Sequence, residues 1–112
     1  MKKNKRNGHV PVRMLDAVGT FAENKDFARE LRRDVILPAL KAQGIVILDF
    51  SGVESATQSF IHALISELIR EFGIQVLDQI LFKGCTESVK KIVSIVVEYM
   101  QHEEEPTESP DA

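Results

Sequence analysis

The chain has a single cysteine and no long apolar run, and each shortage excludes a class of protein. Because Cys85 has no second cysteine, no internal disulfide can form, and one thiol in a small chain fits a reducing compartment. No apolar stretch reaches the roughly 18 residues needed to cross a bilayer. Pro11, Arg13 and Asp16 interrupt the region where a signal peptide would have its apolar core. We therefore expect a cytoplasmic protein that does not enter a membrane.

Residue spacings that are typical of metal-binding or nucleotide-binding sites are also missing. His9, His62 and His102 are far apart in the sequence, and Cys85 has no neighbouring ligand, so no metal site is predicted. There is no GxGxxG or P-loop glycine pattern. An aspartyl-phosphate receiver would need an acidic pair after its first strand, and only Asp16 lies near that point. We expect no catalytic residues, no cofactor and no enzymatic activity.

The net charge is modest, and each end of the sequence is a segment with charge of one sign. The net charge is −3, with 28% charged residues, which gives no general surface for polyanions. Nucleic-acid binding would rest on MKKNKR alone, which we interpret as a solvated run. Residues 1–8 are predicted to be a flexible basic arm, and residues 102–112 (HEEEPTESPDA) a disordered acidic tail. One folded domain should span residues 9–101.

Four stretches have the character of strands. HVPVRML, from His9, predicts a strand in which Pro11 favours an edge position, and AVGTF predicts a short second strand. GIVILDF is the clearest strand, and its apolar residues favour a central place with helices covering both faces. QVLDQILF predicts one or two further short strands.

Helical periodicity separates these strands. A first helix should begin after Asn24 as N-cap, and Pro38 should kink or end it. SFIHALISELIREF predicts a second helix that closes at Gly73. TESVKKIVSIVVEYM predicts a third, with Thr86 as its cap. We therefore expect an α/β fold in which a small mixed β-sheet packs with about three helices.

The second helix has one face of small residues. At about 100° per residue its large apolar side chains fall on one arc, and Ser59, Ala63 and Ser66 fall opposite. We expect these three residues to form an exposed stripe that a partner's backbone can approach closely.

The start of this helix has two possible caps. Either Ser55 caps it in a capping box with Gln58, or Thr57 is the cap. In both cases Ser59 lies near free backbone N–H groups and the positive end of the helix dipole. A phosphate could be accommodated there without unfolding the domain.

The order of these motifs resembles a known family. VILDFSGVESATQSF, then an amphipathic helix and ILFKGCTESVKKIV, resembles the STAS-like domains of bacteria, relatives of the anti-sigma factor antagonists. The likeness covers about residues 10–101. It rests on the aspartate that ends the strand, the Ser-Gly-Val turn and the Ser-Phe pair that opens the helix. Most of these relatives have no assigned function.

For antagonists of this type the resemblance implies a partner switch. The unmodified domain docks on a histidine-kinase-like ATPase that is also a serine kinase, and phosphorylation of a serine at the helix start releases it. Ser59 matches that serine, and Asp49 matches the aspartate at the strand end. Antagonists usually read Asp-Ser-Ser-Gly at the helix start. This chain reads Thr-Gln-Ser-Phe from Thr57 to Phe60, without the acidic residue and with a ring after the serine.

We interpret the chain as a non-enzymatic regulatory protein–protein interaction domain, with Ser59 as its candidate phosphorylation site. The alternative is a sensor that binds a small ligand in a pocket at the carboxyl ends of the strands. The sequence leaves the partner, the signal and the oligomeric state open. The predicted docking face comprises Asp49, Ser51, Gly52, Ser55, Thr57, Gln58, Ser59, Ala63 and Ser66.

Overall fold

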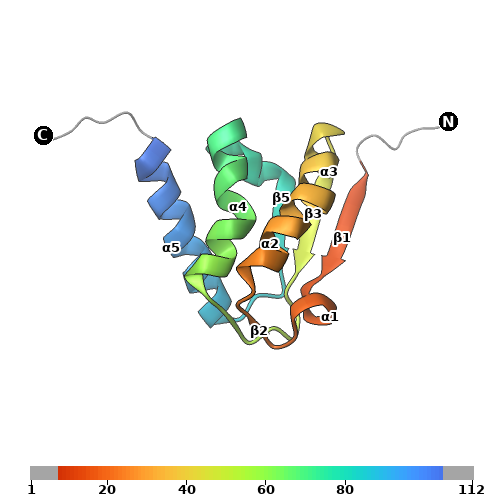
Figure 1. The fold of residues 1–112 in the computed structure, drawn as a ribbon, viewed down its shortest axis with the longest axis vertical. Helices are drawn as coiled ribbons and strands as arrows, with labels where there is room; N and C mark the ends of the chain where they lie inside the picture. The colour runs from red at the N-terminus through yellow and green to blue at the C-terminus, as the bar shows by residue number, and fades with distance from the viewer. Residues whose placement is uncertain (1–7, 105–112) are drawn as a thin grey trace, which may run out of the picture.

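The computed structural model describes residues 8–104 and has two layers, a small sheet and a layer of helices (Figure 1). The sheet has the strand order β1-β3-β5, formed by β1 (His9–Arg13), β3 (Ile45–Asp49) and β5 (Ile80–Lys83). A separate pair joins β2 (Phe21–Ala22) to β4 (Ser55–Ala56). The α/β fold class is confirmed. Every pairing among the described strands is parallel, although a mixed sheet was expected.

Three long helical segments accompany the sheet, as predicted. They and the shorter helices are α1 (Met14–Val18), α2 (Lys25–Leu31), the π-helical turn η2 (Arg32–Ile36), α3 (Leu37–Lys41), α4 (Gln58–Phe72), the 3-10 helix η3 (Ile74–Gln79) and α5 (Glu87–Glu104). The segments α2, η2 and α3 follow one another without a break. None of these described helices is both long and apolar enough to span a membrane.

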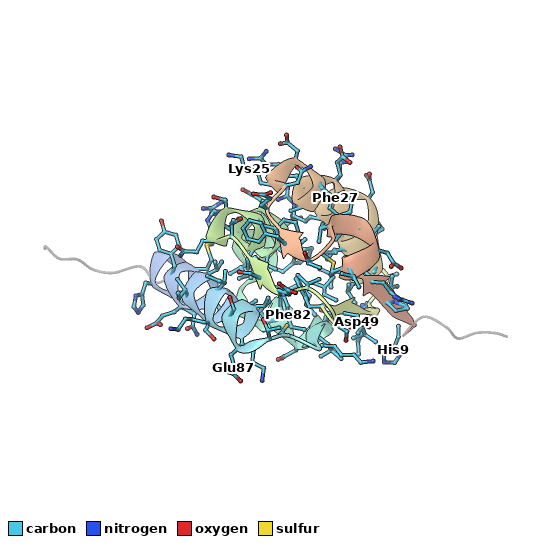
Figure 2. All side chains as sticks on the ribbon, turned by 90° about the horizontal axis from the view of Figure 1, so that it is seen from below. His9, Lys25, Phe27, Asp49, Phe82 and Glu87 are labelled. Atoms are coloured by element: carbon cyan, nitrogen blue, oxygen red, sulfur yellow. The ribbon has the colours of Figure 1, made fainter. Side chains whose placement is uncertain are left out.

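The core lies between the helices and one face of the sheet. Val46, Leu48 and Ile80 are buried, and the parallel register places Val46 beside Ile80 on the same face. The long helices stand on this side, with α5 next to α4 (Figures 1 and 2). β3 is central, as predicted, but helices cover only one of its faces. On the other face Ile47 is half-buried, and Leu81 beside it is 46% exposed.

Several boundaries differ from the sequence-based expectations. β1 ends at Arg13 and lies at the sheet edge, as Pro11 indicated. The expected strand AVGTF is mostly α1 and a turn, and only Phe21 belongs to β2. In QVLDQILF, the first half is 3-10 helix, and β5 begins at Ile80. α5 continues past the expected domain end at 101 to Glu104, so residues 102–104 of the expected tail at 102–112 are helical. The rest of that tail, and residues 1–7 of the expected arm at 1–8, lie outside the described residues.

Pro38 neither ends nor interrupts the first helical segment. The Leu37 N–H bonds to the carbonyl of Arg32, five residues back, which is the π-helical pattern of η2. Proline has no N–H for the carbonyl four residues before it, and its ring crowds that turn. The extra residue in the preceding π-helical turn gives the ring room.

Candidate functional site

The start of α4 is capped by Thr57 and not by Ser55. Thr57 has extended backbone angles, and its hydroxyl accepts the Phe60 N–H at 3.0 Å. The Ser55 hydroxyl instead lies 3.2 Å from the Ser88 hydroxyl at the start of α5. Ser59 is therefore in the first turn of α4, where it is exposed. The Phe60 ring that follows it is fully buried, so it points away from the surface around Ser59.

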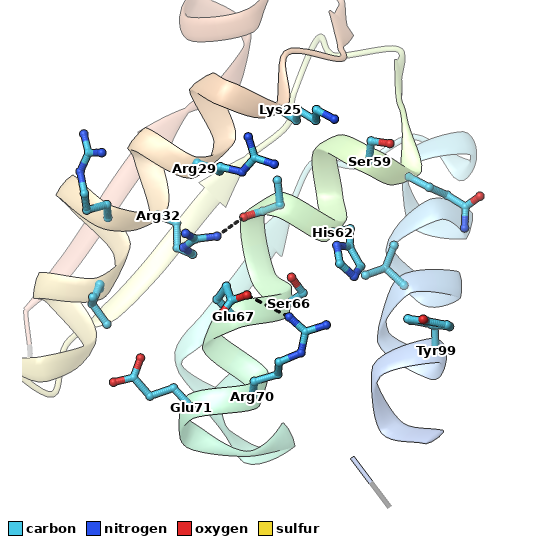
Figure 3. A pocket seen from close by; sticks show the side chains of 15 residues that line it. Lys25, Arg29, Arg32, Ser59, His62, Ser66, Glu67, Arg70, Glu71 and Tyr99 are labelled. Atoms are coloured by element: carbon cyan, nitrogen blue, oxygen red, sulfur yellow. Dashed lines mark hydrogen bonds and ion pairs between the residues drawn. The ribbon is translucent and has the colours of Figure 1, made fainter. Parts of the chain in front are cut away.

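The stripe of small residues on α4 is the floor of a groove. Ser59 is exposed, as expected, but Ala63 and Ser66 are only 7% and 3% exposed. α2 and η2 rise on one side of the stripe and α5 on the other (Figure 3). The hollow has a volume of about 720 Å³, and we call it the α4 groove. It is lined by Lys25, Arg29, Arg32, Arg33, Leu37, Gln58, Ser59, His62, Ala63, Ser66, Glu67, Arg70, Glu71, Val96 and Tyr99.

The α2 side of the groove is basic. Lys25, Arg29, Arg32 and Arg33 come from α2 and η2, and in Figure 3 Lys25 extends toward Ser59. This basic wall was not predicted from the sequence. The spacing of four, seven and eight residues from Lys25 places all four cations on one helical face, and that signal was available.

The cations of the groove differ in how they are paired. Arg29 and Arg33 have surface carboxylates beside them, Asp26 at 2.9 Å and Asp34 at 2.8 Å. The hydrogen bond from Arg33 holds the pKa of Asp34 below its ordinary value. Arg32 instead donates to the carbonyl oxygen of Ala63 at 2.7 Å, which fastens η2 to α4.

Ser66 is a buried polar residue at the groove floor. It is the one buried polar side chain of the described core, at 3% exposed. Its hydroxyl has no hydrogen-bond partner among residues 8–104. A buried hydroxyl without a partner is unfavourable by about 1–3 kcal/mol, so it is ready to bond with a group that enters the groove.

The other predicted docking residues do not line the groove: Asp49, Ser51, Gly52, Ser55 and Thr57. Asp49 lies at the carboxyl end of β3 (Figure 2). Asp49 accepts the Ser51 N–H at 3.0 Å, and hydrogen bonds from Ser51 hold the pKa of Asp49 below its ordinary value. Gly52 has φ +89°, and a Cβ there would lie 2.7 Å from the side chain of Leu15. These groups shape the turn that follows β3. The predicted docking face is thus two surfaces, and the groove holds only Gln58, Ser59, Ala63 and Ser66.

The remaining chemically reactive groups form no second site. Cys85 is half-buried, and burial raises the pKa of its thiol, which keeps the sulfur protonated. Within the described part of the chain, no group of three His, Cys, Asp or Glu side chains could hold a metal ion.

Comparison with known proteins gives one result. No match was found among curated proteins or among solved structures. A protein-family model described as a STAS-like domain of unknown function matches residues 28–90, more than half of the chain. That span runs from α2, through β3 and α4, into the first turn of α5, so it includes most of the α4 groove. The chain belongs to this family of STAS-like domains.

Proposed function

We propose that this protein is a non-enzymatic regulatory domain that binds a partner protein through the α4 groove. The observation that carries the proposal is the floor of small side chains, Ser59, Ala63 and Ser66, between two raised helices. Small side chains let the backbone of another chain come close. Tyr99, which is 56% exposed on the α5 wall, offers an aromatic anchor of the kind that protein interfaces favour.

The partner, by resemblance to anti-sigma factor antagonists, is a histidine-kinase-like ATPase or a serine kinase. A basic, partly apolar groove suits a protein surface that carries carboxylates. The predicted pocket at the carboxyl ends of the strands has less support, because Asp49, Ser51 and Ser55 bond to their own neighbours. We therefore place binding at the groove.

Phosphorylation of Ser59 is the proposed switch. The side chain is exposed in the first turn of α4, where a phosphate would meet the positive end of the helix dipole. Lys25 extends toward the same rim and can pair with it (Figure 3). The buried Phe60 ring leaves the hydroxyl open to a kinase. A phosphate adds about −2 charge at the mouth of the groove, which would repel an acidic partner.

The test compares three baits in lysate of the source cells: the wild-type protein, Ser59→Asp and Ser94→Asp. Ser94 is an exposed serine on α5 that lies outside the groove, so the control adds the same charge elsewhere. We expect one defined protein to bind the wild type and the Ser94 variant and to be lost with the Ser59 variant.

The captured protein is then purified and titrated against the three forms. A tenfold or greater loss of affinity for Ser59→Asp alone would support the groove as the docking site. Equal affinity for all three forms would place the contact on another face and leave Ser59 without a switching role. Phosphopeptide mass spectrometry of the protein from its own cells tests the modification directly.

A further inference from the structure

The outer face of α5 exposes apolar side chains. In Figure 1, α5 is the outermost helix of its layer, with α4 on its inner side. Val89, Val96 and Met100 of α5 are buried. Ile95 and Tyr99 are 41% and 56% exposed, and they are two of the four large apolar side chains that are exposed in the described part of the chain. Because residues four apart lie on the same side of a helix, these two side chains form one patch.

The spacing of residues on this face is typical of a helix that packs against a second helix. Intervals of four, three, four and three residues separate Ser88, Ile92, Ile95, Tyr99 and His102. Such a repeat forms one stripe along the helix, which is the seam of a coiled coil. Ile92 is half-buried and the other four residues are exposed, so the stripe is open to a second helix. Its middle is apolar, which centres any contact on Ile95.

Two opposite charges lie on one flank of this seam. Lys91 and Glu98 are exposed, and at about 100° per residue both lie about 40–60° from Ile95 on the same side. Neither has an ion-pair partner within residues 8–104. Lys90 and Glu87 lie further round the helix and pair with each other at 3.9 Å. The charged side chains that line the α4 groove come from α2, η2 and α4, on the inner side of α5.

A second copy of the chain in the antiparallel direction satisfies both of these charges. A two-fold axis that relates two antiparallel helices brings the same flank of each helix together. With Ile95 opposite Ile95 of the second copy, Lys91 lies beside Glu98 of the second copy and Glu98 beside its Lys91. On the other flank, the same register places Ile92 beside Tyr99 of the second copy. Charges on the flanks of a helical seam set the orientation of the pair, and here they select the antiparallel one.

We propose that two copies of this protein form an antiparallel dimer through the outer face of α5. The apolar stripe around Ile95 forms its centre, and Lys91 of each copy pairs with Glu98 of the other. A contact between two single helices is small, and interfaces below about 1,200 Å² are typical of transient complexes. Tyr99 also lines the α4 groove, so the dimer competes with a groove partner for this side chain. The dimer itself does not depend on the proposed function, whereas this competition rests on it.

Sedimentation equilibrium of the whole chain, from micromolar to millimolar concentration, tests the dimer without a partner. We expect Lys91→Glu and Glu98→Lys each to weaken self-association about tenfold or more, because each substitution turns both symmetric ion pairs into like-charge pairs. The double variant Lys91→Glu with Glu98→Lys restores both pairs in the opposite sense. Its self-association should return to within about threefold of the wild type.

A mixture of the two single variants gives a second test of the same contact. Lys91→Glu leaves two acidic residues on the flank and Glu98→Lys leaves two basic ones, so the mixed dimer should be tighter than either homodimer. Ile95→Ser removes the apolar centre and should weaken self-association about tenfold. The matched control is Lys90→Glu, which makes the same change in net charge on an exposed residue further from the seam. This control should stay within about threefold of the wild type.

Far-UV circular dichroism of each variant verifies that the protein is folded, and all the substituted side chains are exposed. The proposal is overturned if the wild type stays monomeric over the whole range of concentration. It is also overturned if all variants self-associate equally, because the copies would then meet through another face. These results are independent of the capture experiment with Ser59→Asp. An α5 dimer without any captured partner would count against the proposed function alone, and a captured partner with a monomeric wild type against the dimer alone.

Discussion

Three hydroxyl groups along α4 have different roles because their surroundings differ. Thr57 caps the helix, Ser59 faces solvent at the rim, and Ser66 is buried at the groove floor. Helical spacing placed Ser59 and Ser66 on one side of α4 correctly. It did not predict that Ser66 is buried, because burial depends on how far α2 and α5 rise beside it. The side of the helix on which a residue lies follows from the local sequence, whereas how deeply its side chain is buried depends on the neighbouring helices.

Asp49 provides a test based on pH. Hydrogen bonds from Ser51 lower its pKa in the folded protein from the ordinary value of 3.8. A carboxyl group of this kind stabilises the fold above its unfolded pKa, and the contribution is lost as the pH falls through the folded value. We expect Asp49→Asn to lose less unfolding free energy than the wild type between about pH 6 and about pH 2.

Urea unfolding at the two pH values measures this difference. The asparagine retains an oxygen that can accept the Ser51 N–H, so the turn itself should persist in the variant. If both proteins lose the same stability on acidification, the Asp49 carboxylate has no special role in the turn.

Three helix ends were predicted correctly from local signals, because a cap is a contact over three or four residues. Asn24 and Thr86 each accept an N–H from three residues further on, as their positions indicated. Gly73 ends α4 with φ +89°. The errors fall where a backbone pattern depends on tertiary contacts. η3 was taken for a strand because its apolar residues suit either form, and Gln79 within it bonds to the distant carbonyl of Gly44.

Thr86 does more than cap α5. Its hydroxyl accepts the Val89 N–H at 3.2 Å and donates to the carbonyl oxygen of Glu54 at 2.9 Å. It therefore ties α5 to the loop before β4. We expect Thr86→Ala to lower the free energy of unfolding by about 1–3 kcal/mol, the sum of a lost cap and a lost hydrogen bond. Thr57→Ala, which removes only a cap, should lower it by about 1 kcal/mol.

The matched control is Thr86→Ser, which keeps the hydroxyl and should stay within about 0.5 kcal/mol of the wild type. Urea unfolding measures the free energy of unfolding of the wild type and of the three variants, Thr86→Ala, Thr86→Ser and Thr57→Ala. Equal stability of the alanine and serine variants at position 86 would show that neither hydrogen bond contributes.

The sequence predicted the order of strands and helices but not how they are layered. β3 was expected between two helical layers, since all of its residues from Ile45 to Leu48 are apolar. The long helices instead gather on one side, and this gathering also creates the α4 groove (Figure 1). Local periodicity says which residues avoid water, but not whether a helix or another part of the protein covers them. The basic wall was missed for a related reason: spacing puts its four cations on one helical face, but that this face borders a groove depends on how α4 and α5 lie beside it.

Two adjacent residues of β5 test this one-sided arrangement. Ile80 faces the helices and is 3% exposed, whereas Leu81 faces away and is 46% exposed. Removing a buried isoleucine side chain leaves a cavity, so Ile80→Ala should lower the free energy of unfolding by about 2–5 kcal/mol. Leu81→Ala should change it by no more than about 1 kcal/mol, because the leucine gains little from burial. Urea unfolding at several protein concentrations measures the change in stability caused by each of the two substitutions. If Leu81→Ala proved as damaging as Ile80→Ala, and more so at higher concentration, the far face of the sheet would be buried against a second copy of the chain.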